Sequence, residues 1–303
     1  MTVHRSMSDF LTTRELAALL RVKERKVYNL VATGSLPVRR VTGKLLFPRK
    51  EIESWLGGTA EPHKADAAPA TASDPSPLPL ILAGGHDPLL EWALRESRSG
   101  IAAFLDGALD GLDRAARGEC VAVGLHVPDP HGWNVGAVEG RFCRDPWVLI
   151  EWARRVRGLI YRPDMARPPK GLKDIRGLRF QARQPEAGSE LVLDRLLSAE
   201  KMTRADLKLV DTIERTETDL AQAIATGRAD VGLGIAAAAR LHNLRFLPLL
   251  EERFDLLVWR KAYFDPPFQK LVAFCHAPLF EARAAELGGY DVSGFGTVHY
   301  NCC

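Results

Sequence analysis

Apolar residues near the start of the chain repeat at helical spacing in two short stretches. The first stretch follows Thr12 and Glu15, whose spacing is that of a capping box, in which two side chains satisfy free N–H groups at a helix start. The second stretch, residues 23–32, ends before Gly34, a residue suited to the left-handed turn that stops a helix. Two short helices joined by a tight turn predict a helix-turn-helix. Their apolar faces consist of Leu16, Leu19, Leu20, Val27, Leu30 and Val31.

A small β-hairpin is predicted after the two helices. Residues 38–41 and 44–47 are strand-like and flank a Thr-Gly turn at 42–43. Pro48 then suits the first turn of a closing helix, in which Ile52 can pack back onto the other two helices. The segment therefore predicts a compact winged helix-turn-helix unit.

From residue 80 onward, short apolar strands alternate with helices. Such alternation predicts an α/β domain in which parallel sheets are covered by helices, and the remaining length suffices for two lobes of around five strands each. A ligand then binds at the carboxyl ends of the strands, where the helices begin. The predicted strands are residues 80–83, 101–105, 121–125, 159–161, 178–182, 207–210 and 231–235.

Residues 57–79 separate the two parts. They contain five prolines and no aromatic residue. Such a stretch cannot bury a core, and proline favours an extended, partly stiff backbone. We therefore predict a winged domain at residues 1–57, a linker at 58–78 and an α/β domain at 79–303.

Positive charge is concentrated at the N-terminal end of the chain. The 303 residues carry a formal net charge of +3. Residues 1–60 contain eleven Lys and Arg against five Asp and Glu, so they contribute +6 and the remainder contributes −3. Because Lys and Arg neutralise phosphates, this asymmetry predicts a polyanionic partner for the N-terminal unit, with a merely solvated surface as the alternative.

Residues 11–56, LTTRELAALLRVKERKVYNLVATGSLPVRRVTGKLLFPRKEIESWL, resemble the excisionase-type, MerR-related winged helix-turn-helix family. The resemblance implies that the second helix enters the major groove of double-stranded DNA and that the wing contacts the backbone or the minor groove. A domain this small offers a modest interface, so we expect a homodimer or higher homo-oligomer on paired half-sites. The expected contacts are Arg25, Lys26, Tyr28 and Asn29 of the helix and Arg39, Arg40 and Lys44 of the wing.

The second unit resembles a ligand-binding family over nearly its whole length. Matching stretches include LAGGHDPLLEWAL, RFQARQPEAGSELVLDRLL and TDLAQAIATGRADVGLGIAAAA. They are similar to the two-lobed, type II periplasmic-binding-protein-like domain of certain bacterial regulators, a group related to molybdate- and tungstate-binding proteins. The resemblance implies that a small polar ligand lies in an interlobe cleft. The residues it implies are His86, Asp87, Arg183, Gln184, Ser189 and Thr216.

Strand-to-helix junctions offer further candidate contacts. Glycine lets a ligand approach the backbone, and a first helical turn presents free N–H donors, so Asp106 and Gly107 are candidate cleft walls. Trp133 and Asn134 can supply an aromatic face and an amide to an organic ligand. The alternatives are ordinary turn and capping roles for the junctions and packing for Trp133. The junctions are Gly84–Pro88, Asp106–Leu109, Ala187–Glu190 and Thr216–Asp219.

Two glutamates depart from the family pattern. Where relatives tend to read Gly-Ser-Gly-Thr-Arg, this chain has Glu190 and Leu191 in place of the threonine and arginine, and Glu217 replaces a histidine. A carboxylate about 4 Å from an anion costs roughly 4 kcal/mol at an effective dielectric constant of about 20. Either these glutamates point away from the cleft, or the ligand is a zwitterionic or amine-bearing metabolite rather than an oxyanion.

Other classes of protein find little support in the sequence. The hydrophobic fraction of 46% fits a globular protein, and no apolar run is long enough for a membrane span. Five cysteines without a CxxC pair suit reduced thiols in the cytoplasm, and the terminal His299, Cys302 and Cys303 lack zinc-site spacing. Nucleophile-elbow, Walker and zinc-protease motifs are absent, so we expect no enzyme activity, no metal and no cofactor.

The pattern as a whole favours a cytoplasmic transcriptional regulator that senses a small polar effector and binds a double-stranded DNA operator. Effector binding would change how paired subunits present their DNA-binding units. An alternative is an architectural excisionase-like protein whose C-terminal domain mediates protein contacts. A third is a solute-binding or catalytic domain merely tethered to DNA, although the sequence offers no nucleophile and base for it.

Overall fold

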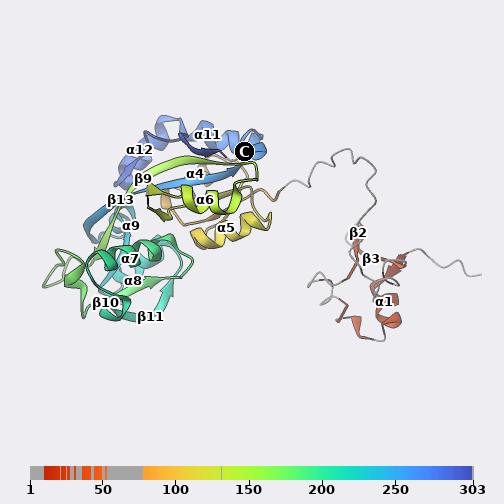
Figure 1. Ribbon diagram of the computed structural model, residues 1–303, viewed down its shortest axis with the longest axis horizontal. Coiled ribbons are helices and arrows are strands. Elements are labelled where there is room, and N and C mark those ends of the chain that lie inside the picture. The colour runs from red at the N-terminus through yellow and green to blue at the C-terminus, as the bar shows by residue number, and fades with distance from the viewer. Residues whose placement is uncertain are drawn as a thin grey trace, which may run out of the picture. The chain divides into compact units, whose positions relative to one another are not determined.

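The computed structural model divides into two units, Met1–Pro75 and Ser76–Cys303 (Figure 1). The division falls inside the predicted linker, whose residues 58–77 lie outside the described part of the chain, so the linker stays a prediction. For residues 39–41 and 44 the backbone alone is described. The described residues are 10–20, 22–24, 26–27, 31, 36–41, 44–49, 52, 78–130 and 132–301.

The first helix of the N-terminal unit, α1 (Thr13–Leu19), begins where the sequence predicts. The Thr12 hydroxyl accepts from the Glu15 backbone N–H at 3.3 Å, and the Glu15 carboxylate accepts from the Thr12 N–H at 2.8 Å. This reciprocal pair confirms the predicted capping box. Of the second predicted helix, the described residues Glu24, Lys26, Val27 and Val31 are helical.

A three-stranded sheet completes the described part of this unit. Strands β2 (Arg39–Val41) and β3 (Lys44–Pro48) pair antiparallel, which confirms the predicted hairpin. Strand β1 (Phe10–Thr12) pairs with the other side of β3. One detail of the prediction is wrong: Pro48 pairs with Phe10 as the last residue of β3, because β1 extends the ladder to that position, and does not open the closing helix. The buried core includes Leu11, Leu16, Ala17, Val27, Leu36, Phe47 and Ile52.

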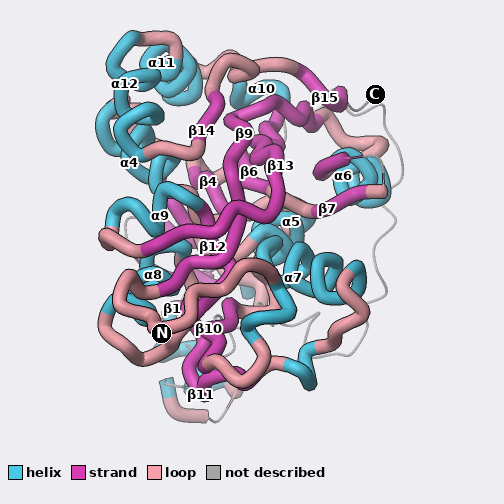
Figure 2. Tube along the Cα trace, turned by 90° about the vertical axis from the view of Figure 1, so that its left-hand side faces the viewer, coloured by secondary structure: helices cyan, strands magenta, loops and turns pink. Residues whose placement is uncertain are grey.

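The C-terminal unit is built on one ten-stranded sheet (Figure 2). Eight strands follow in the order β11-β10-β12-β9-β13-β6-β4-β5, and the two short strands β14 and β15 pair with β9 outside this order. Strand β4 pairs parallel with β5 and β6, and β10 pairs parallel with β11 and β12, as the alternating pattern predicts. The parallel strands are β4 (Ile81–Gly84), β5 (Ala102–Phe104), β6 (Ala122–Leu125), β10 (Arg179–Arg183), β11 (Lys208–Glu214) and β12 (Val231–Ile235).

Two long strands link the halves of this sheet. Strands β9 (Trp147–Tyr161) and β13 (Arg245–Trp259) pair antiparallel with each other along their length. The start of β9 and the end of β13 lie beside β4–β6, which we call the first lobe, whereas their other ends lie beside β10–β12, the second lobe. The sequence predicted two separate parallel sheets and located only residues 159–161 of β9. The sheet is continuous and mixed because these strands pass through both lobes.

Helices and short strands cover the sheet and supply its apolar contacts. The described helices of the second unit do not include one long and apolar enough to cross a membrane. The first lobe carries α4 (Pro88–Glu96), α5 (Ala108–Ala116), α6 (Val135–Phe142), α10 (Arg260–Tyr263), α11 (Pro266–Cys275) and α12 (Pro278–Leu287). The second carries α7 (Gly188–Ala199), α8 (Glu217–Ala225) and α9 (Ala236–Leu241). Short strands are β7 (Pro128–Asp129), β8 (Gly132–Trp133), β14 (Tyr290–Asp291) and β15 (Val298–Asn301).

Candidate ligand-binding site between the two lobes

Strand ends of the two lobes face each other. In the first lobe β4 leads into α4, and in the second lobe β10 and β11 lead into α7 and α8. The Glu217 backbone N–H donates across the lobes to His86 Nδ1 at 3.2 Å, and the Leu109 N–H donates to the Glu186 carbonyl at 3.0 Å. The lobes therefore contact each other through the junctions that the sequence singles out.

Six buried charged side chains form a continuous series of ion pairs from the first lobe to the second, which we call the ion-pair chain. Arg155 on β9 donates to Asp87 Oδ2 at 2.8 Å and also pairs with Glu252 on β13. Arg157 on β9 donates to Glu252 Oε2 at 2.6 Å and to Glu217 Oε1 at 2.9 Å. The members in order are Asp87, Arg155, Glu252, Arg157, Glu217 and Arg183.

The ion-pair chain keeps the buried carboxylates of Glu252 and Glu217 ionised. Burial by itself raises the pKa of Glu252, but the charges of Arg155 and Arg157 outweigh it and lower the pKa to about 2. Burial likewise opposes ionisation of Glu217, yet Arg157 and Arg183 hold its pKa far below the ordinary range. Both groups therefore carry a negative charge at neutral pH.

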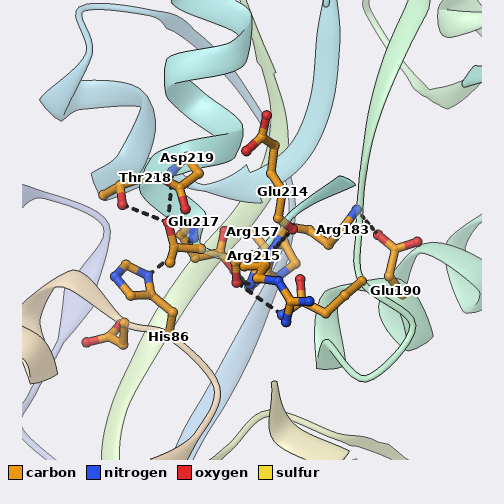
Figure 3. A network of polar contacts seen from close by, with 12 residues as sticks. His86, Arg157, Arg183, Glu190, Glu214, Arg215, Glu217, Thr218 and Asp219 are labelled. Atoms are coloured by element: carbon orange, nitrogen blue, oxygen red, sulfur yellow. Dashed lines mark hydrogen bonds and ion pairs between the residues drawn. The ribbon is translucent and has the colours of Figure 1, made fainter. Parts of the chain in front are cut away.

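Arg183 is the least well paired of the three arginines. Its Nη1 lies 3.1 Å from Glu217 Oε1 without hydrogen-bond alignment, while its other nitrogens donate to backbone carbonyls of residues 214 and 215. Burial lowers the pKa of Arg183 and outweighs the attraction of Glu217. For Arg157, by contrast, Glu217 and Glu252 together outweigh burial and raise the pKa. Figure 3 shows Arg157 and Arg183 converging on Glu217.

Several buried polar atoms at this junction make no hydrogen bond with another described residue. Proteins rarely bury polar atoms in this state, so a cluster of them points to a ligand or water. Each belongs to a strand end, a helix start or the ion-pair chain. Within the described part of the C-terminal unit they include Arg157 Nη1, Glu217 Oε2, Ser189 Oγ, Gln184 Oε1 and both ring nitrogens of His126.

His126 reaches from the first lobe to the start of α7 in the second lobe. It follows β6 in the first lobe, and its ring stacks on Phe254 with 5.7 Å between centroids. A Cβ added at Gly188, the first residue of α7, would lie 2.9 Å from His126 Nε2, so the start of α7 touches the ring. Burial lowers the pKa of His126 to about 3, and the ring is therefore neutral at physiological pH.

Two of the residues implied by family resemblance act as helix caps. The Asp87 carboxylate caps α4 by accepting from the Leu90 N–H at 2.7 Å, and its other oxygen accepts from Arg155 and from the Tyr290 hydroxyl. The Thr216 hydroxyl caps α8 by accepting from the Asp219 N–H at 2.9 Å. Asp87 has no oxygen left over, so the structure gives it a positioning role rather than a ligand contact.

Asp106, Gly107 and Gln184 lie where the lobes meet. Asp106 pairs with Arg215 of the second lobe at 2.5 Å, and its carbonyl accepts from Gln184 Nε2 at 3.0 Å. Gly107 has a φ of +127°, and a Cβ there would meet the Glu186 carbonyl oxygen at 2.8 Å. These residues hold the lobes together, and among them Gln184 keeps an unpartnered oxygen.

The two departing glutamates have different surroundings. Glu190 accepts from the Arg183 backbone N–H at 2.9 Å and pairs with Arg204 at 2.5 Å, so its charge is neutralised within the second lobe. Glu217 is fully buried inside the ion-pair chain. Its Oε2 has no hydrogen-bond partner among the described residues and lies near Gly234 of β12, so Glu217 is the glutamate that keeps an unpartnered atom at the lobe junction.

His86 links the two lobes, and both of its ring nitrogens have hydrogen-bond partners. Its Nδ1 accepts from the Glu217 N–H, so the proton of the neutral ring lies on Nε2, which is 3.2 Å from Glu91 Oε2. Hydrogen bonding to His86 lowers the pKa of Glu91. Figure 3 shows His86 reaching Glu217 from the other lobe.

The neighbouring residues Trp133 and Asn134 have different surroundings in the structure. The Asn134 amide accepts from the Val127 N–H at 2.6 Å and donates to Asp255 at 2.8 Å and to two backbone carbonyls. No Asn134 amide N–H is free to donate to a ligand, because both already donate within the protein. The prediction that Asn134 supplies its amide to a ligand is therefore wrong. Trp133 lines a cavity of about 340 Å³ between the lobes, opposite Val192 and Leu196 of α7.

Sequence reasoning missed the arginines of β9, Glu252 of β13 and His126. Arg155 and Arg157 stand two residues apart in a largely apolar strand that also contains Glu151 and Arg154, and this spacing places both side chains on one face of the sheet. Glu252 pairs with Arg155 in the strand register. Charged residues at alternate positions of an apolar strand are the signal that could have revealed the ion-pair chain.

The expected DNA contacts fall mostly outside the described side chains. Arg25, Tyr28 and Asn29 lie outside the described residues, and so do the side chains of the wing residues Arg39, Arg40 and Lys44, whose backbone lies in β2 and β3. Lys26 is described, helical and exposed. These contacts remain predictions.

Comparisons with known proteins cover both units. Residues 91–276 match the family model described as PBP superfamily domain, and residues 10–59 match that of a helix-turn-helix domain. The uncharacterized protein YvgK of Bacillus subtilis is 24% identical over 299 residues, which are 95% of this chain and 96% of that protein. An uncharacterized Clostridium pasteurianum protein, encoded in the 5′ region of a 2Fe-2S ferredoxin gene, is 30% identical over 80 residues, 26% of this chain and 71% of its own.

A solved structure supports the fold of the C-terminal unit. It is a putative phosphate ABC transporter substrate-binding protein with bound phosphate from Clostridium perfringens, with a TM-score of 0.52 and 10% sequence identity. The match covers 68% of this chain and 96% of that one. At this identity the likeness concerns the fold alone.

Proposed function

Since the chain belongs to the PBP superfamily and also carries a helix-turn-helix domain, we propose that it is a DNA-binding regulator that responds to a small polar ligand. The ligand binds between the two lobes of the C-terminal unit, and the N-terminal unit binds double-stranded DNA. Both ligand classes suggested by the sequence, an oxyanion and a zwitterionic metabolite, are small and polar. The protein acts in the cytoplasm, as a homodimer or higher homo-oligomer and without catalysis.

The observation that carries this proposal is the group of unpartnered buried polar atoms at the lobe junction. Arg157 Nη1, Ser189 Oγ and Glu217 Oε2 belong to β9, α7 and α8. Arg157 donates to Glu217, and Ser189 precedes Glu190, which accepts from the Arg183 N–H. Leaving a buried polar atom unpaired costs about 1–3 kcal/mol. A polar ligand that satisfies these atoms repays that cost. An architectural protein that makes only protein contacts has no use for them.

The long strands β9 and β13 provide the route by which ligand binding changes the unit. They run through both lobes, and register shifts occur in their pairing at Pro248/Leu250 and Phe254/Asp255, on either side of the position where Arg155 meets Glu252. Such irregularities concentrate bending in a sheet. A ligand that contacts both lobes favours the arrangement in which they touch, and this differential affinity is what regulation of DNA binding requires.

A two-stage experiment on the full chain tests the proposal. Amino acids, sugars, nucleosides and inorganic oxyanions are screened at millimolar concentration by thermal shift, and each hit is then added to a DNA-binding assay that uses duplexes selected from a random pool. We expect at least one compound to raise the melting temperature in a saturable way and to change the affinity for DNA. A protein that binds duplex DNA but responds to no compound in the panel contradicts the proposal.

A further inference from the structure

We propose that the interlobe site takes a zwitterion, a ligand with a cationic and an anionic group but no net charge, and that Glu217 sets this preference. The inference rests on the proposed function and names the ligand class for the same site. It follows from the balance of charge at the lobe junction and from the chemistry of the atoms that lack partners.

The ion-pair chain is balanced in charge. It contains the carboxylates of Asp87, Glu217 and Glu252 and the guanidinium groups of three arginines. All six side chains are at most 2% exposed, so solvent screens their charges poorly. The formal charges cancel, and the neutral ring of His126 adds none.

A balanced site disfavours a dianion. Each arginine that could meet an oxyanion already pairs with a carboxylate, and Glu217 lies between Arg157 and Arg183. An oxyanion placed against these two arginines would also lie beside the Glu217 carboxylate, with which it would repel in a poorly screened environment. The described residues of this junction supply a matching carboxylate for each guanidinium, so an oxyanion would find no cation there that lacks a carboxylate partner.

The unpartnered atoms include both donors and acceptors. Arg157 Nη1 and Ser189 Oγ can donate, whereas Glu217 Oε2 and Gln184 Oε1 can accept. A ligand that carries acceptors alone would leave the two oxygens unsatisfied. A zwitterion satisfies both kinds, because its ammonium group donates to Glu217 Oε2 and its carboxylate accepts from Arg157 Nη1.

Ser189 supplies the second contact for the anionic end. It lies in the first turn of α7, a helix of 12 residues, and its hydroxyl is buried and unpartnered. The N-terminus of a helix favours negative charge through its free N–H groups and its dipole. A carboxylate fits this position, whereas an uncharged polyol would meet the charged Glu217 and Arg157 without charges of its own.

The test compares probes and variants of the full chain by isothermal titration calorimetry. The probes are the neutral L-amino acids, inorganic phosphate and xylitol. The variants are Glu217→Gln, Ser189→Ala and Glu251→Gln, the last a matched control because Glu251 is exposed and lies next to the ion-pair chain on β13. Circular dichroism verifies the fold of each. Ser189→Ala leaves every ion pair in place, so the test stands even if Glu217→Gln does not fold.

We expect wild type and Glu251→Gln to bind at least one neutral amino acid and to show no saturable phosphate binding. Ser189→Ala lowers the amino-acid affinity about tenfold. Glu217→Gln lowers it at least as much and gains phosphate binding, because the junction then holds one surplus positive charge.

Three results overturn the inference. Saturable phosphate binding by wild type that Ser189→Ala weakens, with no amino acid bound, makes the site an oxyanion site and leaves the proposed function standing. Xylitol binding without amino-acid binding shows that the site takes an uncharged ligand, and it also leaves the proposed function standing. If no probe binds, the zwitterion class is wrong, and the wider screen above then decides separately whether the protein responds to any ligand.

Discussion

Replacing Glu252 by Gln tests whether the ion-pair chain stabilises the C-terminal unit. The Glu252 carboxylate accepts from Arg155 Nε at 2.9 Å, from Arg157 Nε at 2.6 Å and from Arg157 Nη2 at 2.9 Å, and it is fully buried. The Glu252→Gln side chain keeps the shape but loses the charge, so Arg155 and Arg157 lose the carboxylate that they share.

The magnitude follows from the pKa of Glu252. In the folded protein the pKa is lowered from its ordinary value of 4.5 to about 2, a difference of about 2.5 pH units. At roughly 1.4 kcal/mol per unit, ionised Glu252 contributes on the order of 3–4 kcal/mol to the free energy of unfolding at pH 7. Breaking a buried pair by removing one partner costs about 3–5 kcal/mol, which agrees.

Urea unfolding of the full chain at pH 7, followed by tryptophan fluorescence, measures this loss. The control is Glu251→Gln, since Glu251 is 62% exposed and lies 3.7 Å from Arg154. Exposed pairs contribute about 0–1 kcal/mol, so the control stays close to wild type. If Glu252→Gln is as stable as Glu251→Gln, the ion-pair chain does not stabilise the fold and the reasoning from its pKa values is wrong.

Three further predictions concern pH, packing and contact between the lobes. Because the pKa values of Glu252 and Glu217 are lower in the folded than in the unfolded protein, the stabilisation by both groups is present above about pH 4.5 and is lost as the pH falls toward the folded values. Wild type should therefore lose more stability than Glu252→Gln between about pH 5 and about pH 3 in urea titrations. Equal losses would contradict this. Asn134→Ala leaves the Val127 N–H without its partner and removes one hydrogen bond from Asp255, which keeps Arg253, so it should cost about 1–3 kcal/mol in the same assay. A loss below about 0.5 kcal/mol would show that the Asn134 hydrogen bonds matter little. Gly188→Ala places a Cβ 2.7 Å from the His126 carbonyl oxygen and should separate the lobes, so hydrogen-exchange protection of the Leu109 amide, which donates to the Glu186 carbonyl, should fall. Gly140→Ala, whose Cβ meets nothing within 4 Å, is the control for this exchange measurement, and unchanged protection in Gly188→Ala would refute the close contact.

The sequence predicts well those features that depend on residues close together along the chain. The Thr12–Glu15 capping box lies within one helical turn, and the β2–β3 hairpin is encoded by two short strands around a turn. Short apolar runs that end before glycine or helix-capping residues likewise predict the strands of both lobes. Local chemistry therefore located the junctions where the lobes meet.

The ion-pair chain escaped prediction because its partners are distant in sequence. Arg155 and Glu252 are 97 positions apart, and the register of β9 against β13 brings them together. From the junction residues alone, the sequence left open whether Glu190 and Glu217 point away from the cleft or meet a zwitterionic or amine-bearing ligand. The arginines of β9 and Arg204 neutralise these glutamates, and the outcome is a balanced site.

Under the proposed function, a ligand bound between the lobes changes how strongly the chain binds DNA. The most direct measurement is fluorescence anisotropy of a selected, labelled duplex titrated with the full chain, with and without the amino acid that binds most tightly. We expect DNA binding that weakens as salt rises and a ligand-induced change in Kd of about fivefold or more. In Ser189→Ala this change should require a higher ligand concentration. A Kd for DNA that stays the same at every ligand concentration would contradict the proposed function.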